Sequence, residues 1–121
     1  MISVEKQTEG AACTVLLAKE FINNENPLIV CNSDQILDWN PLSVLYQVNS
    51  QNLDGFVLTF PSNETKWSYV KTDGYDIITE VAEKKVISNR ATCGVYGFSR
   101  GNSCVWAIEE MIKKDIRTNG E

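Results

Sequence analysis

The sequence predicts an α/β fold with a mixed, mainly parallel sheet, and two observations carry this prediction. Residues 27–31 form a short apolar run that ends abruptly in the polar cluster Asn32-Ser33-Asp34-Gln35. Such a run is typical of a strand that is buried on both faces, as strands of parallel sheets are. A helical pattern comes directly before this strand, and a short strand pattern comes before the helix. Strand, helix, strand is the order of a parallel crossover unit.

The first elements are a strand at residues 1–6 and a helix at residues 11–23. Apolar residues recur in the helix at three- and four-residue steps, so that they form one stripe along it. The stripe consists of Ala12, Val15, Leu16 and Ile22, and it is interrupted by Lys19, whose charged end can reach water. We expect the helix to end in the Asn-rich segment before Pro27, because the residue before proline avoids the helical region.

A second helix is predicted to begin at Asn40-Pro41, since proline is favoured in the first helical turn. Its inward side would carry Leu42, Leu45 and Val48.

Four strands follow, at residues 55–60, 67–72, 75–81 and 92–98. Asp73-Gly74 predicts a two-residue hairpin turn between the middle two. The last helix is predicted over residues 103–116, with Val105, Ile108 and Ile112 facing inward.

Length and composition limit the possible functions. The 121 residues correspond to one domain, and the hydrophobic share of 43% is that of an ordinary globular protein. A net charge of −5 argues against nucleic-acid binding, because no basic stripe is present to contact phosphates. No apolar stretch approaches the roughly 20 residues of a membrane span, and no signal peptide is recognisable at the start, so we expect a cytoplasmic protein without a membrane partner.

Cysteine and histidine usage narrows the chemistry further. The four cysteines are scattered and form no C-x-x-C pair, so buried free thiols are favoured over disulfides or a zinc site. The chain contains no histidine. Ser-His-Asp catalysis, Cys-His catalysis and histidine-bearing zinc sites are therefore excluded.

Asp34 is the leading candidate for a site residue. In open α/β sheets, ligands collect outside the carboxyl ends of the strands, and a carboxylate there can hold a divalent cation against phosphate oxygens. Two alternatives remain open: Asp34 could be a solvated loop residue or a helix cap. Asp34 and Asp38 together could suggest a calcium loop, but the further ligands and the closing Glu of such a loop are missing.

Several segments together resemble one known family. They are Gly10-Ala11-Ala12-Cys13 at a helix start, the run 28–34 (LIVCNSD) ending in Asp34, the segment 80–85 (EVAEKK), and residues 92–96 (TCGVY). Residues 67–70 (WSYV) also fall where the family often has Tyr-Gly-Val-Val. In this order and spacing they resemble the sugar-phosphate nucleotidyltransferases, in the style of the glucose-1-phosphate thymidylyltransferases. The resemblance covers nearly the whole chain and corresponds to the middle section of the family.

The resemblance implies a Rossmann-like, three-layer α/β/α fold of the nucleotide-diphospho-sugar transferase type, incomplete at both ends. Residues 1–121 would be a single partial domain, its central and sugar-binding part. Such a partial sheet would have exposed edges, which invite pairing with a second copy of the chain.

The resemblance also implies a set of site residues and substrates. Asp34 would bind Mg²⁺ and, with Lys84, would be catalytic, while Glu83 would accept hydrogen bonds from sugar hydroxyls. The substrates would be a nucleoside triphosphate and a sugar 1-phosphate. The remaining substrate-binding residues would be Gly10 and Ala11 near the base, Trp67, Gly94 at a close approach to the sugar, and Glu121. Without the resemblance, residues 83–85 would be a charged strand end and the tryptophans packing residues.

The predicted function is therefore that of a fragment of a nucleotidyltransferase that makes nucleotide sugars and releases pyrophosphate. The family's glycine-rich triphosphate loop and its second metal-binding Asp have no counterpart in the chain, so we expect the isolated chain to be inactive. Lys85 stands where the family has proline, and Cys13 stands where thymidylyl enzymes have glutamine. Two alternatives are a type A glycosyltransferase, which usually carries Asp-x-Asp where this chain has Asn32-Ser33-Asp34, and a non-catalytic module that binds a sugar phosphate or assists assembly.

Overall fold

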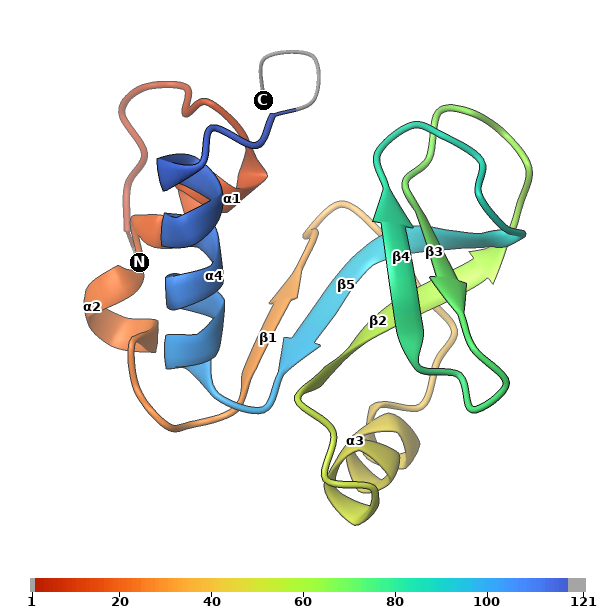
Figure 1. The fold of residues 1–121 in the computed structure, drawn as a ribbon. Coiled ribbons are helices and arrows are strands. Elements are labelled where there is room, and N and C mark those ends of the chain that lie inside the picture. Colours follow the sequence, from red (N-terminus) through yellow and green to blue (C-terminus); the bar gives the residue numbers. More distant parts are fainter. Residues whose placement is uncertain (1, 118–121) are drawn as a thin grey trace. The chain divides into compact units, whose positions relative to one another are not determined.

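The structure is a computed structural model that describes residues 2–117, and it contains helices and strands in an α/β arrangement (Figure 1). The helices are α1 (Ala11–Leu16), α2 (Lys19–Ile22), α3 (Pro41–Ser50) and α4 (Gly101–Lys113). The strands are β1 (Leu28–Cys31), β2 (Gly55–Pro61), β3 (Tyr69–Thr72), β4 (Ile78–Ala82) and β5 (Arg90–Phe98). The α/β class is thus confirmed.

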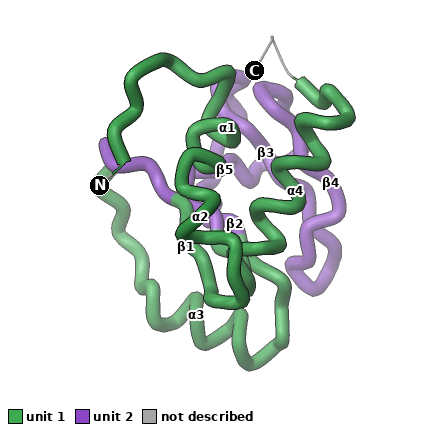
Figure 2. Tube along the Cα trace, turned by 90° about the vertical axis from the view of Figure 1, so that its left-hand side faces the viewer, with its two compact units in different colours: residues 1–30, 35–56, 97–121 green, residues 31–34, 57–96 purple. Residues whose placement is uncertain are grey.

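The chain divides into two compact units, coloured separately in Figure 2. Unit 1 comprises residues up to 30, 35–56 and those from 97 onward, and it contains all four helices. Unit 2 comprises residues 31–34 and 57–96, and it contains β3, β4 and most of β5. Each unit has a small core of its own: Val48, Cys104 and Val105 are buried in unit 1, and Tyr69, Val70, Ala91 and Val95 in unit 2.

The sheet has the strand order β1-β5-β3-β4, and β2 also pairs with β5. Strand β3 is antiparallel to both β4 and β5, and the arrows of β1 and β2 in Figure 1 run opposite to that of β5. The sheet is therefore mostly antiparallel, and the prediction of a mainly parallel sheet is not supported. Along β1, half-buried and exposed residues alternate, so the prediction of burial on both faces was wrong. Alternation of this kind is usual in antiparallel strands that have one face toward water.

The predicted crossover unit is absent because its first strand does not form. Residues 2–6 are exposed and take part in no strand, so nothing pairs with their backbone. The predicted helix at 11–23 is divided into α1 and α2, with a turn at Leu17 and Ala18 between them. Both helices pack against α4 within unit 1, as Figure 1 shows.

Helix α3 begins as its sequence predicts. The backbone of Asn40 is extended, its side-chain oxygen accepts a hydrogen bond from the Ser43 backbone N–H at 3.1 Å, and Pro41 occupies the first turn. Val48 is buried as predicted, whereas Leu42 is 79% exposed, contrary to the prediction that it faces inward.

Helix α4 begins two residues before the predicted start at Ser103 and ends at Lys113. Val105 is buried as predicted, but Ile112 is exposed. The early start depends on Gly101, because a Cβ atom there would lie 2.0 Å from the Ile22 carbonyl oxygen. The backbone N–H groups of Gly101 and Asn102 donate to the carbonyl oxygens of Asn26 and Asn24, each at 2.9 Å. The loop after α2 is thereby joined to the first turn of α4.

The β3–β4 hairpin forms, but its turn differs from the predicted two-residue type. The loop covers residues 73–77, and the Asp73 carboxylate accepts hydrogen bonds from the backbone N–H groups of Tyr75 (2.8 Å) and Ile77 (3.0 Å). The left-handed residue is Asp76, with φ of 62°, rather than Gly74. An aspartate that hydrogen-bonds to the following backbone in this way favours a longer turn.

The four cysteines are free thiols, and their burial differs from one to the next. Cys104 is buried, Cys13 and Cys93 are half-buried, and Cys31 is exposed, so the prediction of burial was wrong for Cys31. The exposure of Cys31 follows from the same one-sided burial of β1. Among residues 2–117, no helix has the length and apolar character needed to cross a membrane.

Candidate functional site

The segment that follows β1 is hydrogen-bonded to the middle of β5 shortly before Asp34. The Asn32 backbone N–H donates to the Gly94 carbonyl oxygen at 3.1 Å, and Asp34 follows two residues later. Asp34 is exposed, and no hydrogen bond or ion pair involves its carboxylate within the described part of the chain. Its oxygens are therefore available to a ligand in solution.

Two features of the structure require glycine at position 94. Its φ is 78°, in the left-handed region that favours glycine, and a Cβ atom would lie 2.4 Å from Nδ2 of Asn32. The space that a side chain would fill is thus occupied by the Asn32 amide. Contact between Gly94 and a sugar stays a prediction.

Glu83 and Lys84 follow β4 directly, and the sheet register brings them next to β3. Tyr69 is paired with Ala82 of β4 and with Ala91 of β5, so the residues beside these pairs are neighbours too. The Ser68 hydroxyl donates a hydrogen bond to Oε2 of Glu83. Nζ of Lys84 lies 3.8 Å from Oε1 of the same carboxylate.

The Glu83–Lys84 ion pair is weak, because both side chains are exposed to water. The Lys84 backbone has φ of 50°, which is uncommon for a residue with a side chain. A lysine in such a pair can exchange its partner for a phosphate, and a carboxylate can accept further hydroxyl hydrogen bonds.

Hydrogen bonds connect the predicted site segments within unit 2. Asn32 is bonded to Gly94, and the Thr92 backbone N–H donates to the Ser68 carbonyl oxygen at 2.8 Å. Ser68 in turn is bonded to Glu83. These hydrogen bonds, continued along β5 from Thr92 to Gly94, link the four segments that contain Asp34, Gly94, Trp67 and Glu83–Lys84.

Trp67 is half-buried, and its ring has protein neighbours. The ring centroids of Trp67 and Phe60 are 5.3 Å apart in an edge-on arrangement, and Nζ of Lys66 lies 4.9 Å from the Trp67 ring. Its indole Nε1 is buried and has no acceptor among the described residues. These contacts favour a packing role for Trp67, and its role as a substrate-binding residue stays a prediction.

The other predicted site residues lie elsewhere. Gly10 and Ala11 belong to unit 1, where Gly10 precedes α1 with φ of 152° and its carbonyl oxygen accepts from the Thr14 N–H at 3.1 Å. The start of the helix at Ala11 agrees with the sequence. Glu121 lies outside the described residues.

The donor set at Asp34 fits one ligand of a hard divalent cation. Among residues 2–117, no group of three or more His, Cys, Asp or Glu side chains is arranged to hold a metal ion. Mg²⁺ does not require such a cage, since it usually takes one or two carboxylates together with water and substrate phosphate oxygens. A single unpaired carboxylate, such as that of Asp34, suits this kind of binding.

The Cys93 and Cys104 thiols are poor nucleophiles. Burial raises the pKa of the Cys93 thiol, an effect partly offset by backbone hydrogen bonds, and burial also raises the pKa of Cys104. The Cys93 thiol also donates to the Leu58 carbonyl oxygen at 3.4 Å. Since thiolate is the reactive form, the raised pKa values disfavour a nucleophilic role for Cys93 and Cys104.

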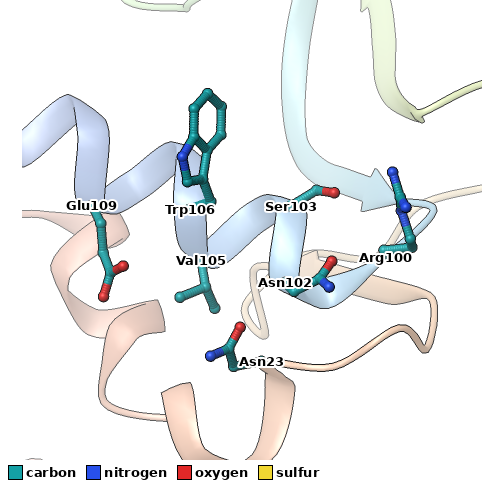
Figure 3. A pocket seen from close by; sticks show the side chains of 7 residues that line it. All are labelled: Asn23, Arg100, Asn102, Ser103, Val105, Trp106 and Glu109. Atoms are coloured by element: carbon teal, nitrogen blue, oxygen red, sulfur yellow. The ribbon is translucent and has the colours of Figure 1, made fainter.

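A surface pocket in unit 1 lies beside α4 (Figure 3). Trp106 and Glu109 project from the helix, and Arg100 precedes it. Three of its polar side chains have protein partners: Asn102 donates to Glu25 at 2.7 Å, Arg100 lies 3.7 Å from Glu25, and Glu109 pairs with Lys19. None of the sequence-predicted site residues lines it.

Sequence reasoning missed the roles of Asn32 and Ser68. Both belong to motifs that were recognised in the sequence, but neither was assigned a function. Their partners are distant in the sequence, 62 residues away for Asn32 and 15 for Ser68, so no local pattern could reveal the contacts.

Comparisons with known proteins show the family to which the chain belongs. A family model described as nucleotidyl transferase matches residues 1–117. The chain is similar to the solved structure of a nucleoside-diphosphate-sugar pyrophosphorylase from Vibrio cholerae, with 25% identity and a TM-score of 0.75. The match covers 98% of this chain and 50% of the Vibrio chain, so the present chain spans about half the length of that protein. No curated protein matches the chain.

Proposed function

The chain belongs to the nucleotidyl transferase family, and from this premise we propose that it contributes to transfer of a nucleotide from a nucleoside triphosphate to a sugar 1-phosphate, with release of pyrophosphate. One observation carries the proposal beyond the family: the Asp34, Gly94 and Glu83–Lys84 segments are joined by hydrogen bonds within unit 2. The likeness to a nucleoside-diphosphate-sugar pyrophosphorylase supports a sugar phosphate as one substrate.

Each group in this site has a role that its chemistry allows. Lys84 would bind the phosphate of the sugar 1-phosphate as a point charge, and Glu83 would accept hydrogen bonds from the sugar hydroxyls. Asp34 would hold Mg²⁺, which when bound neutralises charge on the phosphate oxygens. The transfer itself needs no covalent intermediate, so positioning and charge stabilisation by these residues would supply much of the rate.

We further propose that residues 1–121 form the central and sugar-binding part of a nucleotidyltransferase domain. Gly10 and Ala11 would contact the base, and Trp67, Gly94 and Glu121 would contact substrate. The 121 residues include no glycine-rich loop with Arg and Lys to hold the triphosphate. We therefore expect negligible pyrophosphate release from this chain alone with nucleoside triphosphate, sugar 1-phosphate and magnesium.

Binding measurements test the sugar-phosphate site directly. In calorimetric titrations with glucose 1-phosphate in the presence of Mg²⁺, we expect saturable binding to the wild-type chain. Lys84→Ala should weaken it about tenfold or more, since a charge-assisted contact is lost. Lys71→Ala is the matched control: it removes the same charge from an exposed side chain of β3 in the same unit, and it should change the affinity by less than about twofold.

The outcomes separate the alternatives. Equal weakening by Lys71→Ala and Lys84→Ala would mean that only the net charge matters, which contradicts a specific site at Lys84. If none of glucose, galactose and mannose 1-phosphate binds, the proposed function is wrong and a structural role is favoured. Robust pyrophosphate release would contradict the expected inactivity of the isolated chain.

A further inference from the structure

The hydrogen bond between Ser68 and Glu83 connects a residue of unassigned function to the proposed sugar-binding carboxylate. The Ser68 hydroxyl donates to Oε2 of Glu83, and the two residues are 15 positions apart in the sequence. Ser68 is the donor in this contact through its side chain, so the contact depends on the serine hydroxyl and is lost in any residue without one.

A hydrogen bond and the burial of the next residue fix the backbone at Ser68. Its carbonyl oxygen accepts a hydrogen bond from the Thr92 N–H at 2.8 Å. The next residue, Tyr69, is fully buried, and its hydroxyl donates to the Glu64 carbonyl oxygen at 2.7 Å. Because the donor is attached to a fixed backbone, its hydrogen bond restricts the orientation of the carboxylate that accepts it.

The two carboxylate oxygens of Glu83 therefore have different partners. Oε2 accepts from Ser68, while Oε1 faces Nζ of Lys84 at 3.8 Å, a distance beyond that of a normal hydrogen bond. A carboxylate oxygen can accept two hydrogen bonds, so Oε1 retains free accepting capacity. Lys84 supplies a positive charge on the same side, suited to a phosphate.

We propose that Ser68 is a positioning residue that sets sugar selectivity by fixing Glu83, so that Oε1 meets one sugar hydroxyl while Lys84 binds the phosphate. This inference rests on the proposed function, because it assumes that a sugar 1-phosphate binds at Glu83 and Lys84. The ligands it concerns are hexose 1-phosphates that differ in the orientation of one hydroxyl group. A fixed acceptor distinguishes such epimers, whereas a freely rotating carboxylate adapts to each of them.

The test compares dissociation constants for glucose, galactose and mannose 1-phosphate, with inorganic phosphate as a probe of the Lys84 charge alone. For the wild-type chain we expect at least one pair of epimers to differ in affinity. Ser68→Ala should reduce that ratio about fivefold or more, because the orienting hydrogen bond is lost. Binding of inorganic phosphate should change by less than about twofold, since Ser68→Ala leaves the Lys84 charge in place.

Two further variants distinguish positioning from a general structural effect. Ser68→Thr keeps the hydroxyl and should restore the wild-type ratio. Ser88→Ala removes a hydroxyl of the same unit that donates to the Val70 carbonyl oxygen at 2.6 Å and accepts from the Arg90 N–H at 2.9 Å, and it should leave the ratio unchanged.

The results separate failure of this inference from failure of the proposed function. A wild-type chain that binds none of the three phosphosugars overturns the proposed function, and the inference with it. A wild-type chain that binds all three equally, or a Ser68→Ala chain that keeps the wild-type ratio, overturns the inference alone. A Ser88→Ala effect as large as that of Ser68→Ala also overturns it.

Discussion

The Asn32 side-chain amide packs so closely against the Gly94 backbone that no room remains for a side chain at position 94. The Asn32 N–H donates to the Gly94 carbonyl oxygen, and the Asn32 side chain lies beside the Gly94 Cα. This contact fixes the end of β1 two residues before Asp34. At the scale of single residues, the integrity of the candidate site therefore depends on the fit between the Gly94 backbone and the Asn32 amide.

Replacing Gly94 with alanine should lower the free energy of unfolding by about 1–3 kcal/mol, because the left-handed backbone becomes strained and the new Cβ meets Asn32. Urea denaturation measures this change. Gly74→Ala is the matched control, since no atom lies within 4 Å of its Cβ position, and it should alter stability by no more than about 0.5 kcal/mol.

An Asn32→Gly background separates the two causes. With the amide removed, Gly94→Ala should cost less, because only the backbone strain remains. An equal cost in both backgrounds would show that the Asn32 contact contributes nothing to the requirement for glycine.

At this scale, local features were predictable and non-local pairings were not. The helix start at Asn40-Pro41 was predicted from the proline, and the cap that the structure shows there is also local, since Asn40 accepts from an N–H three residues away. The site segments were recognised from their motifs. The pairing of Ser68 with Glu83 and of Asn32 with Gly94 depends on the strand register, which only the folded sheet defines.

The beginning of α4 and the end of α2 form a closely packed contact at the scale of elements. Gly101 approaches the Ile22 carbonyl, and the loop between α2 and β1 accepts hydrogen bonds from the first residues of α4. The side chains of Asn102 and Arg100 also contact Glu25. Since the first backbone donors of α4 have protein acceptors, this helix end is satisfied without a ligand.

Gly101→Ala should therefore destabilise the chain by about 1–3 kcal/mol, as expected where an added methyl group forces the backbone to move. Thermal unfolding followed by circular dichroism gives the shift, with Gly74→Ala again as the control. If Gly101→Ala unfolded at the wild-type temperature, α2 and α4 would be able to move apart at Gly101 without loss of stability.

The cap of α3 allows a second test at this scale. Asn40→Ala should cost about 1 kcal/mol in the free energy of unfolding, because the Ser43 N–H loses its side-chain acceptor. Asn40→Asp retains an acceptor and should stay near the wild type in a urea titration. If the two variants were equally destabilised, the loss would come from something other than the cap.

Most elements were predicted from the sequence, but their arrangement in the sheet was not. The strands 55–60 and 92–98 and the helix beginning at Pro41 agree with the structure within about two residues, because periodicity and caps are local signals. Whether neighbouring strands run parallel or antiparallel is not encoded in a short apolar run. Residues 27–31 therefore suggested a parallel sheet, although β1 pairs with a β5 that runs the opposite way.

Cys93 is half-buried in unit 2, and Cys104 is buried in unit 1. Burial raises the pKa of both thiols above the ordinary value of 9.0. A raised pKa means that the folded chain keeps these protons to a higher pH than the unfolded chain does. At the scale of the whole molecule, this links stability to alkaline pH.

The contribution of these thiols to stability should be fully present below about pH 9 and should be lost as the pH rises through their raised pKa values. Urea midpoints measured between pH 8 and pH 10.5 should fall, and the fall should be shallower for a chain carrying Cys93→Ala and Cys104→Ala. The same replacement at Cys13 and Cys31 is the control. If the urea midpoint of the Cys93→Ala/Cys104→Ala chain fell with pH as steeply as that of the wild type, other groups would cause the loss of stability at alkaline pH.

The contact of Gly101 with Ile22 also limits how the chain can be recombined with its relatives. Residues 22–26 and 100–102 are far apart in the sequence, yet their backbones meet too closely for either to vary independently. In a chimera, the loop after α2 and the first turn of α4 therefore have to come from the same parent. A crossover placed anywhere between residues 27 and 99 separates them, so a library of recombinants should lose folded members unless glycine is kept at position 101.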